Sequence, residues 1–359
     1  MKVYFYQAEC GDAARISFIG NDNNEHNIFI DSGYEETYDH ILHEEILSLD
    51  KKQIDLWIVS HIHDDHIGGI MNYIAAVKRG EYADVVKEWF YNPPRVYDNN
   101  IFSNKSGNVS EIKSISQGDI LYDYLKGING LRKNDITAML ALPDLFGMKI
   151  SVLSPSVKKL ERLRRKYSKM SKSLQRNEME GVSEASGAKV SDYAIKLEDF
   201  NLDAWKEDDS VENGSSITVL TELNGKRVLW LADAHPTDVV KSLKEMGYSE
   251  KNKIKCEWVK VTHHGSKGNN SNALYSIIDC ENYLISADAV NLHYLPTKES
   301  IARIVRNDNR DLNSHYKFYF TYDNNQLRKM FASDSEDVFK KWNFDVDYLS
   351  KEKYYDFYL

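Results

Sequence analysis

The sequence has few of the residues that build disulfide frameworks, linkers or fibres. Its 359 residues include three cysteines, 18 glycines and six prolines. Cys10, Cys256 and Cys280 are odd in number and far apart, which excludes a disulfide framework and favours a reducing compartment. The low glycine and proline contents exclude collagen-like or linker-rich architecture.

Long apolar runs and an excess of positive charge are also missing. No run approaches the roughly 20 residues that span a bilayer, and acidic residues interrupt the N-terminal segment, which is typical of a β-strand rather than a signal peptide. The 46 basic and 55 acidic residues give a net charge of −9, which argues against a nucleic-acid footprint over the whole surface. We therefore expect a soluble cytoplasmic protein.

Apolar periodicity predicts a mixed α/β (α+β) fold. Strands are expected at 2–7, 14–19, 28–30, 54–59, 87–91, 149–153, 216–221, 227–232, 257–262, 283–286 and 316–321. Helices are expected at 38–49, 69–78, 110–127, 157–174, 237–246, 272–279 and 296–306. Asn224-Gly225 between two apolar runs predicts a tight hairpin.

Two adjacent segments have opposite charge. The helix expected at 157–174 is amphipathic and strongly basic. Its cationic face either steers a polyanion such as nucleic acid or is merely solvated while the apolar stripe docks. Residues 177–212 are polar and acidic, and we expect an insertion or a flexible lid there.

The sharpest motif is His61-Ile62-His63-Asp64-Asp65-His66, directly after the strand expected at 54–59. Extended chain puts His61 and His63 on one side, and a turn would bring Asp65 and His66 around. Imidazole and carboxylate groups are ligands for zinc and similar divalent ions. The motif therefore predicts parts of two metal sites, with further ligands from elsewhere in the chain.

Two later strands also end in candidate ligands. Asp233 either bridges two metals through its two oxygens or caps the following helix. His235 is a candidate for a contact with substrate or with a metal ligand. One of His263 and His264 is expected to ligate, and the other to orient the site or touch substrate. Such strand ends gather at one edge of a sheet, where sites form.

Together, H-x-H-x-D-H, a strand-end Asp and a strand-end His resemble the metallo-β-lactamase superfamily. The resemblance implies a four-layer αββα sandwich over residues 1–359, a single domain with insertions at about 95–150 and 155–212. It also implies two metals at one edge of the sandwich. The metal ligands would come from His61, His63, Asp65, His66, Asp233, His263 and His264. Asp31, in I-F-I-D-S-G, matches a structural Asp that supports the ligands by hydrogen bonding.

A narrower likeness is to the metallo-β-lactamase-like domain of the ComEC DNA-uptake family. Glu9-Cys10-Gly11-Asp12-Ala13 resembles its G-Q-G-D-A opening, with Cys10 where Gln is usual. Asn213 to Ser216 resembles its N-x-x-S, His263-His264-Gly265-Ser266 its H-H-G-S, and His293-Tyr294-Leu295-Pro296 a stretched G-H-P. Phosphorylcholine-esterase domains look similar around the paired histidines. No channel helices are present, so DNA transport does not carry over.

One departure from the superfamily concerns a histidine. Members usually carry a further metal-binding His between the first motif and the bridging Asp, whereas this chain has none between His66 and His235. Asn213 or Ser216 is expected in that region. The second metal would then be bound more weakly, be more exposed, or be a harder ion such as manganese.

These residues predict a metal-dependent hydrolase with two divalent ions, Zn²⁺ first, with Mn²⁺ or Fe as alternatives. Two metals about 3.5–4 Å apart would activate a water, which Asp65 and Asp233 would orient. His293 would protonate a leaving group or grip a phosphate, and Lys267 would contact an anionic substrate; either is otherwise a surface residue.

The expected substrate is a phosphodiester, in a small molecule or a nucleic acid. Alternatives are a carboxylic ester, thioester or lactam hydrolase, and a degenerate sensor or partner-binding scaffold that turns over nothing. Protein partners and oligomeric state are left open by the sequence.

Overall fold

The computed structural model describes residues 1–49, 53–96, 109–168, 191–291 and 293–359. Its strands form a six-stranded sheet, a seven-stranded sheet and a small two-stranded sheet. The first sheet has the order β15 (Tyr354–Tyr358), β1 (Lys2–Tyr6), β2 (Ala13–Ile19), β3 (Glu25–Asp31), β4 (Leu56–Ile58), β5 (Trp89–Phe90). The second has the order β14 (Phe344–Tyr348), β13 (Tyr316–Phe320), β12 (Asn282–Ile285), β10 (Trp258–Lys260), β8 (Lys226–Trp230), β7 (Thr218–Leu223), β6 (Lys149–Ser154). The small sheet pairs β9 (Ile254–Lys255) with β11 (Ile278–Asp279).

Helices follow most of the parallel strands. They are α1 (Glu35–Thr37), α2 (His43–Ser48), α3 (Asp64–Arg79), α4 (Val109–Gly127), α5 (Val157–Tyr167), α6 (Pro236–Glu245), α7 (Asn272–Ser276), α8 (Lys298–Val305), α9 (Asn325–Arg328) and α10 (Val338–Lys341). A π turn (Tyr38–Leu42) joins α1 to α2. Short 3₁₀ turns lie at Asp192–Ala194, Leu197–Asp199, Asn213–Ser215 and Thr262–Gly265. None of these helices is long and apolar enough to cross a membrane.

The two large sheets share one pattern of strand directions. In the first, β1, β2 and β3 are antiparallel, and β3, β4 and β5 are parallel. In the second, β6, β7 and β8 are antiparallel, and β8, β10, β12, β13 and β14 are parallel. Parallel strands bring their carboxyl ends to one edge, so each sheet presents such an edge.

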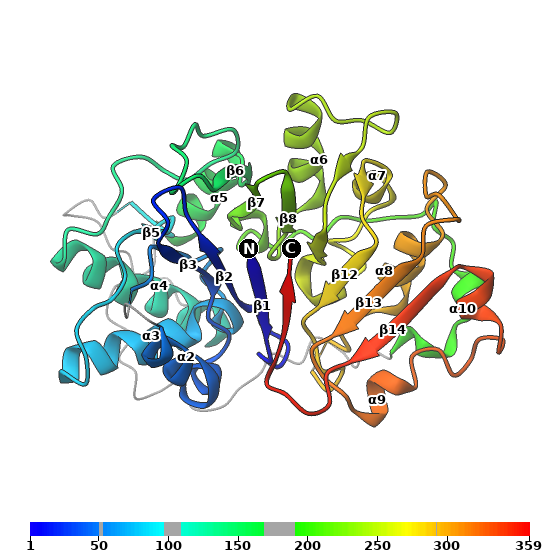
Figure 1. Ribbon diagram of the computed structural model, residues 1–359, viewed down its shortest axis with the longest axis horizontal. Coiled ribbons are helices and arrows are strands. Elements are labelled where there is room, and N and C mark those ends of the chain that lie inside the picture. The colour runs from blue at the N-terminus through cyan, green and yellow to red at the C-terminus, as the bar shows by residue number, and fades with distance from the viewer. Residues whose placement is uncertain (50–52, 97–108, 169–190, 292) are drawn as a thin grey trace.

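Three apolar cores hold four layers together. One lies between the sheets, where Phe5 of β1 packs near Trp230 and Trp258 of the second sheet. A second joins the first sheet to helices α2 to α5, and a third joins the second sheet to α6, α7 and α8. The chain is therefore a helix–sheet–sheet–helix sandwich, as expected, with the N-terminal half on the left of Figure 1 and the C-terminal half on the right.

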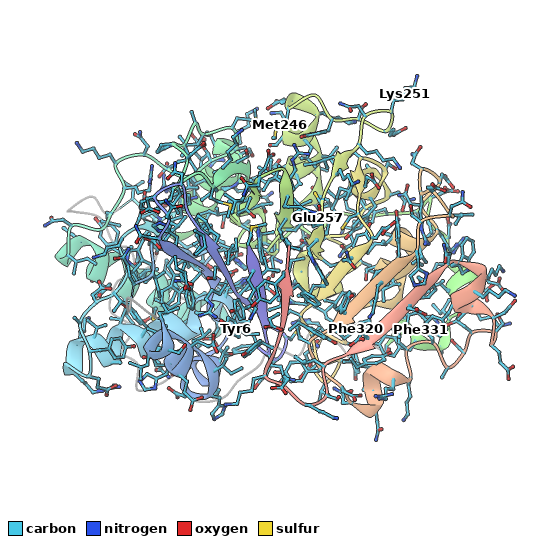
Figure 2. All side chains as sticks on the ribbon, viewed as in Figure 1. Tyr6, Met246, Lys251, Glu257, Phe320 and Phe331 are labelled. Atoms are coloured by element: carbon cyan, nitrogen blue, oxygen red, sulfur yellow. The ribbon has the colours of Figure 1, made fainter. Side chains whose placement is uncertain are left out.

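The side chains follow this layering. Along β1, Val3 and Phe5 enter the core between the sheets, whereas Tyr4 packs on the helical side, the alternation typical of a strand. Phe320, labelled in Figure 2, is buried at the end of β13, whereas the exposed Lys251 projects from the top of the molecule.

The two ends of the chain lie side by side. Strand β15 pairs antiparallel with β1, with Val3 opposite Phe357. Figure 1 shows the N and C labels together between the two halves. The sequence patterns did not single out β14 or β15, whose alternation is only half-buried.

Every expected strand coincides with a strand of the structure, and the expected Asn224-Gly225 hairpin is confirmed. Both turn residues have positive φ, 52° and 78°, as a type I′ turn requires. The helix expected at 38–49 is divided by the π turn. The basic helix ends at Tyr167 in the described chain, and residues 169–174 lie outside the described residues.

The expected flexible lid differs from what the structure shows. Residues 177–190 lie outside the described residues, but 191–212 pack against the second helical layer. Tyr193, Leu197 and Phe200 are buried there. The backbone carbonyls of this segment accept hydrogen bonds from α8 and the residue after it, Arg303 to Leu202 O at 2.9 Å and Arg306 to Leu197 O at 2.8 Å. These cations hold the segment in place without a sheet partner.

Candidate metal centre

The predicted ligands gather where the carboxyl ends of the parallel strands of the two sheets lie close together. Asp31 ends β3, and His61 follows β4 in the first sheet. Asp233 follows β8, and the His263–His264 pair follows β10 in the second. A backbone hydrogen bond from Ile217 N to Ser60 O, 2.8 Å long, ties the two sheets together beside the site.

Helix α3 begins earlier than the sequence indicates. We expected a turn before a helix near Gly69, but the helix starts at Asp64, and His63 is its extended N-cap residue. Asp65 and His66 therefore project from the first helical turn. Acidic residues suit that end, because the helix dipole is positive there. A Cβ on Gly69 would lie 2.4 Å from Ser32 O, so glycine allows α3 to approach the end of β3.

One half of the centre contains Asp65, His66, Asp233 and His264, whose ligand atoms all lie within 4.8 Å of one another. Asp233 Oδ1 lies 3.4 Å from the Nε2 atoms of both histidines. Asp65 Oδ2 lies 3.6 Å from His66 Nε2 and 3.3 Å from His264 Nε2. These are four ligand atoms around one small volume.

The other half uses the second oxygen of Asp233. His61, His63 and Asp233 form a second group whose ligand atoms lie within 4.8 Å of one another. Asp233 Oδ2 lies 3.9 Å from His61 Nε2 and 3.6 Å from His263 Nε2. His263 thus faces the half of the centre that lacks the superfamily's usual intermediate histidine.

Hydrogen bonds on the far side of three of the rings leave their Nε2 atoms facing the centre. His66 Nδ1 donates to Asp31 Oδ2 at 2.8 Å, and His264 Nδ1 donates to Ser286 O at 2.9 Å. Ser60 Oγ donates to Asp31 Oδ2, so it accepts from His61 Nδ1 at 3.0 Å. Such outer partners fix the tautomer and orientation of metal-binding histidines.

An unusual backbone explains how two neighbouring rings reach different halves. His263 and His264 both have left-handed backbones, with φ of 45° and 51°. For non-glycine residues such conformations cost about 1–3 kcal/mol each and persist only where surrounding bonds hold them. Here His263 N donates to Ala232 O at 2.8 Å and Ser266 N donates to His263 O at 2.7 Å.

The carboxylates of the centre favour positive charge on the groups around them. Burial alone would lower the pKa of His66 and His264, but the carboxylates, Asp233 first, hold the first well above its usual value and raise the second to about 9. Burial raises the pKa of Asp233, but the adjacent histidines outweigh burial and hold it well below its usual range.

The donor atoms fit divalent metal ions. His61 Nε2, His66 Nε2, His264 Nε2 and Asp233 Oδ1 are buried and have no hydrogen-bond partner in the described chain. Buried polar atoms without partners are costly, so atoms that converge in this way mark a site for a ligand. Imidazoles and carboxylates are donors that zinc, manganese and iron accept.

Asp12 and Lys260 form a buried ion pair beside the centre. Both are buried, and the Lys260 ammonium donates to Asp12 Oδ2. Asp12 Oδ1 lies 3.4 Å from His264 Nδ1. Although burial raises the pKa of Asp12, Lys260 and His264 outweigh it and hold that pKa below its usual range. A Cβ on Gly11 would lie 2.3 Å from Asp65 O, so this loop packs directly onto α3.

Asn213, Ser216 and His235 lie behind or beside the second half. Asn213 Nδ2 lies 3.4 Å from His263 Nδ1, so Asn213 stands behind that ring. Ser216 is buried, and its Oγ has no hydrogen-bond partner within the described residues. His235 Nδ1 lies 2.9 Å from Lys159 Nζ at the start of α5. His235 belongs to none of the groups of convergent His and Asp ligand atoms in the described chain.

Lys267 and His293 lie outside the ligand groups. Lys267 is exposed, and its ammonium lies 3.5 Å from Glu299 Oε2. His293 is exposed on the loop between β12 and α8, where its N–H donates to Asn291 Oδ1 at 3.1 Å. This loop begins after β12 at Ser286, the residue that holds His264.

The basic helix docks by its apolar stripe. Leu160, Leu163 and Tyr167 of α5 are buried. Lys166 pairs with Glu111 at 2.6 Å and Glu212 at 2.7 Å. Neighbouring carboxylates therefore balance part of the cationic face.

Sequence reasoning did not find the residues that hold His263. They are Asn269, whose Oδ1 lies 2.7 Å from His263 Nδ1, and Asp208, which contacts Asn269. No motif or spacing marks either residue. The available signal was only that Asn269 closely follows the paired histidines.

The comparisons with known proteins bear on the fold. A family model described as "Metallo-beta-lactamase superfamily" matches residues 13–114, which include His61 to His66. No curated protein matches the sequence. Solved structures with a similar trace include CmlA, a diiron beta-hydroxylase from Streptomyces venezuelae (11% identity, TM-score 0.42), and a mutant of the CmlA beta-hydroxylase (11% identity, TM-score 0.40). Each alignment covers 100% of this chain and 54% of the other, so this chain spans about half the length of those proteins.

The family match covers the strands and helix that carry the first ligands, and two face-to-face sheets lie between helical layers. The chain therefore has the metallo-β-lactamase fold.

Proposed function

We propose that this protein is a metal-dependent hydrolase that uses two divalent ions. Its first candidate substrate is a phosphodiester bond. His61, His63 and His263 would hold one ion, and Asp65, His66 and His264 the other. Asp233 would contribute one carboxylate oxygen to each. Zn²⁺ is the first candidate for these donors, with Mn²⁺ or Fe as alternatives.

One observation carries the proposal, namely the position of Asp233 between two sets of imidazoles. Its Oδ1 faces His66 and His264 at 3.4 Å, and its Oδ2 faces His263 at 3.6 Å. A helix cap needs neither arrangement. Asp233 does not cap α6, because the N-cap residue of that helix is His235.

When bound, two divalent ions supply a water of lowered pKa and stabilise charge that develops on the reacting oxygens. The residues of this chain prepare the centre for that chemistry. Asp31, Ser60 and Ser286 keep the protons of three rings on Nδ1, as their hydrogen bonds require. Asp65 and Asp233 would orient the reacting water, and His293 would contact the leaving group.

The substrate class rests on the ComEC-like and phosphorylcholine-esterase-like motifs around Asp12 and His263. We also propose that residues 1–359 are a single domain with insertions at about 95–150 and 155–212. A cytoplasmic location stays a prediction.

The test combines metal content by elemental mass spectrometry with hydrolysis of bis-(p-nitrophenyl) phosphate. The variants are His63→Ala and, as a control, His315→Ala, which removes an exposed histidine that contacts Asn343 and Asp345. We expect about two metals per chain and activity in the wild type and the control, and in His63→Ala a metal content reduced to about one per chain with loss of activity.

The same experiment separates the alternatives. Two metals without phosphodiesterase activity would contradict the substrate class and direct the search to esters, thioesters and lactams. Absence of bound metal after loading with Zn²⁺ or Mn²⁺ would contradict the hydrolase and favour a scaffold.

A further inference from the structure

We infer that Asn269 and Asp208 are positioning residues that hold His263 in place as the third imidazole of the His61/His63 metal site. The inference rests on the proposed two-metal function and deepens it. It begins with the absence of a histidine between His66 and His235, which leaves that site in need of another donor.

Asn269 joins two ligands with one side chain. It is fully buried, and its Oδ1 accepts from His263 Nδ1 at 2.7 Å. Its Nδ2 donates to the backbone oxygen of Asp233 at 3.0 Å. The amide therefore fixes the ring of one ligand relative to the backbone of the other, and it keeps the proton of His263 on Nδ1, so that Nε2 faces Asp233 as a lone pair.

Asp208 fixes that amide in turn. Its Oδ2 accepts from Asn269 Nδ2 at 3.2 Å and from Asn213 Nδ2 at 2.6 Å. Its Oδ1 accepts from Ser210 N at 3.0 Å, and its own N donates to Gly268 O at 3.0 Å. Because the carboxylate accepts only hydrogen bonds, it orients both amides with their NH₂ groups toward it and the oxygen of Asn269 toward the ring.

His263 needs such a support more than the buried rings of His61 and His264. Its side chain is 23% exposed, whereas those of His61 and His264 are 0% and 1% exposed. Packing alone therefore restrains it less than it restrains those two rings. Sites whose ligands are held by hydrogen bonds from neighbouring side chains bind with the right geometry, and loss of such a partner weakens metal affinity about 10- to 100-fold.

The segment that carries Asp208 is itself anchored. Arg303, fully buried on α8, donates to Leu202 O at 2.9 Å and Ala204 O at 2.6 Å, a few residues before Asp208. Trp205 Nε1 donates to Lys267 O at 2.9 Å, between His263 and Asn269 in the chain. The 191–212 segment thus reaches the centre as a fixed support of the metal site.

The test uses Asn269→Leu, which has similar volume and no acceptor, and Asp208→Ala. Asn282→Ala is the control, since the amide of Asn282 donates to Glu257 O at 3.1 Å at the start of β12, away from the carboxyl ends of the strands where the centre lies. Each metal-free protein is titrated with Co²⁺, and the visible absorption and the two dissociation constants are measured by competition with a chelator.

We expect Asn269→Leu to weaken one of the two Co²⁺ equivalents about 10- to 100-fold and to change its absorption, with the other unchanged. Asp208→Ala should change the same equivalent in the same direction by less, and Asn282→Ala should change neither. Wild-type affinity for both equivalents in Asn269→Leu and Asp208→Ala would overturn the inference.

Circular dichroism shows whether each variant is folded, and if Asn269→Leu is not, Asp208→Ala decides by the same criterion. A wild-type protein that binds fewer than two Co²⁺ would instead overturn the proposed two-metal function, so the two failures are distinguishable.

Discussion

Asp233 Oδ2 lies 3.6 Å from Nε2 of His263, the first of two adjacent histidines. The other oxygen of the same carboxylate lies 3.4 Å from Nε2 of the second, His264. Two consecutive left-handed residues make this division possible, because a regular strand end would not direct both rings toward one carboxylate. The two rings therefore face different oxygens of one carboxylate, where the sequence suggested one ligand and one residue that orients the site or touches substrate.

The assignment of the ligands to two halves predicts how many metal ions each double variant retains. A His63→Ala, His263→Ala double variant removes two ligands of one half, so it should retain about one metal per chain. A His263→Ala, His264→Ala double variant removes a ligand from each half and should retain less. Elemental mass spectrometry after Zn²⁺ loading measures both. Equal metal content in the two double variants would contradict the assignment.

Lys260 is expected to be essential for stability rather than for binding substrate. Lys260→Met leaves the buried carboxylate of Asp12 without its ammonium partner, and breaking a buried pair costs about 3–5 kcal/mol. Urea unfolding should show this loss. Lys241→Met, at a largely exposed position on α6, should change stability by no more than about 0.5 kcal/mol. A Lys260→Met protein as stable as the control would show that the pair is not needed.

Gly69 allows α3 to carry its ligands close to the end of β3. Gly69→Ala would put a Cβ 2.4 Å from Ser32 O, so we expect a loss of about 1–3 kcal/mol in the free energy of unfolding. Gly127→Ala is the matched control, since Gly127 ends α4 with nothing within 4 Å of its Cβ position. Thermal unfolding of the two variants compares them, and equal midpoints would refute the close-packing argument.

The strands and the first motif were predictable, because apolar runs and the spacing of His61 to His66 are local. The start of α3 at Asp64 was not, since the helix begins where His63 is held at the sheet edge. The support from Asp208 was also not predictable. It depends on Arg303 reaching carbonyls about 100 positions earlier in the chain, which no local pattern encodes.

The buried thiols should be unreactive in the native protein over the usual pH range. Burial raises the pKa of Cys256 to about 12 from 9.0. Because the pKa is higher in the folded state, the neutral thiol favours folding below about pH 9, and this contribution is lost as the pH rises toward 12. Reaction with a disulfide reagent at pH 8 to 9 should be slow for the native protein and fast in denaturant. Fast native reaction of all three cysteines would contradict their burial.

The most direct test of the account is the number of metal ions per chain in the wild type and in Asp233→Asn, each stripped with a chelator and reloaded with Zn²⁺ or Mn²⁺. Asn retains the size of the side chain but offers a single carbonyl oxygen in place of two carboxylate oxygens. We predict about two ions in the wild type and at most one in the variant. Two ions in both proteins, or none in the wild type, would contradict a centre bridged by Asp233.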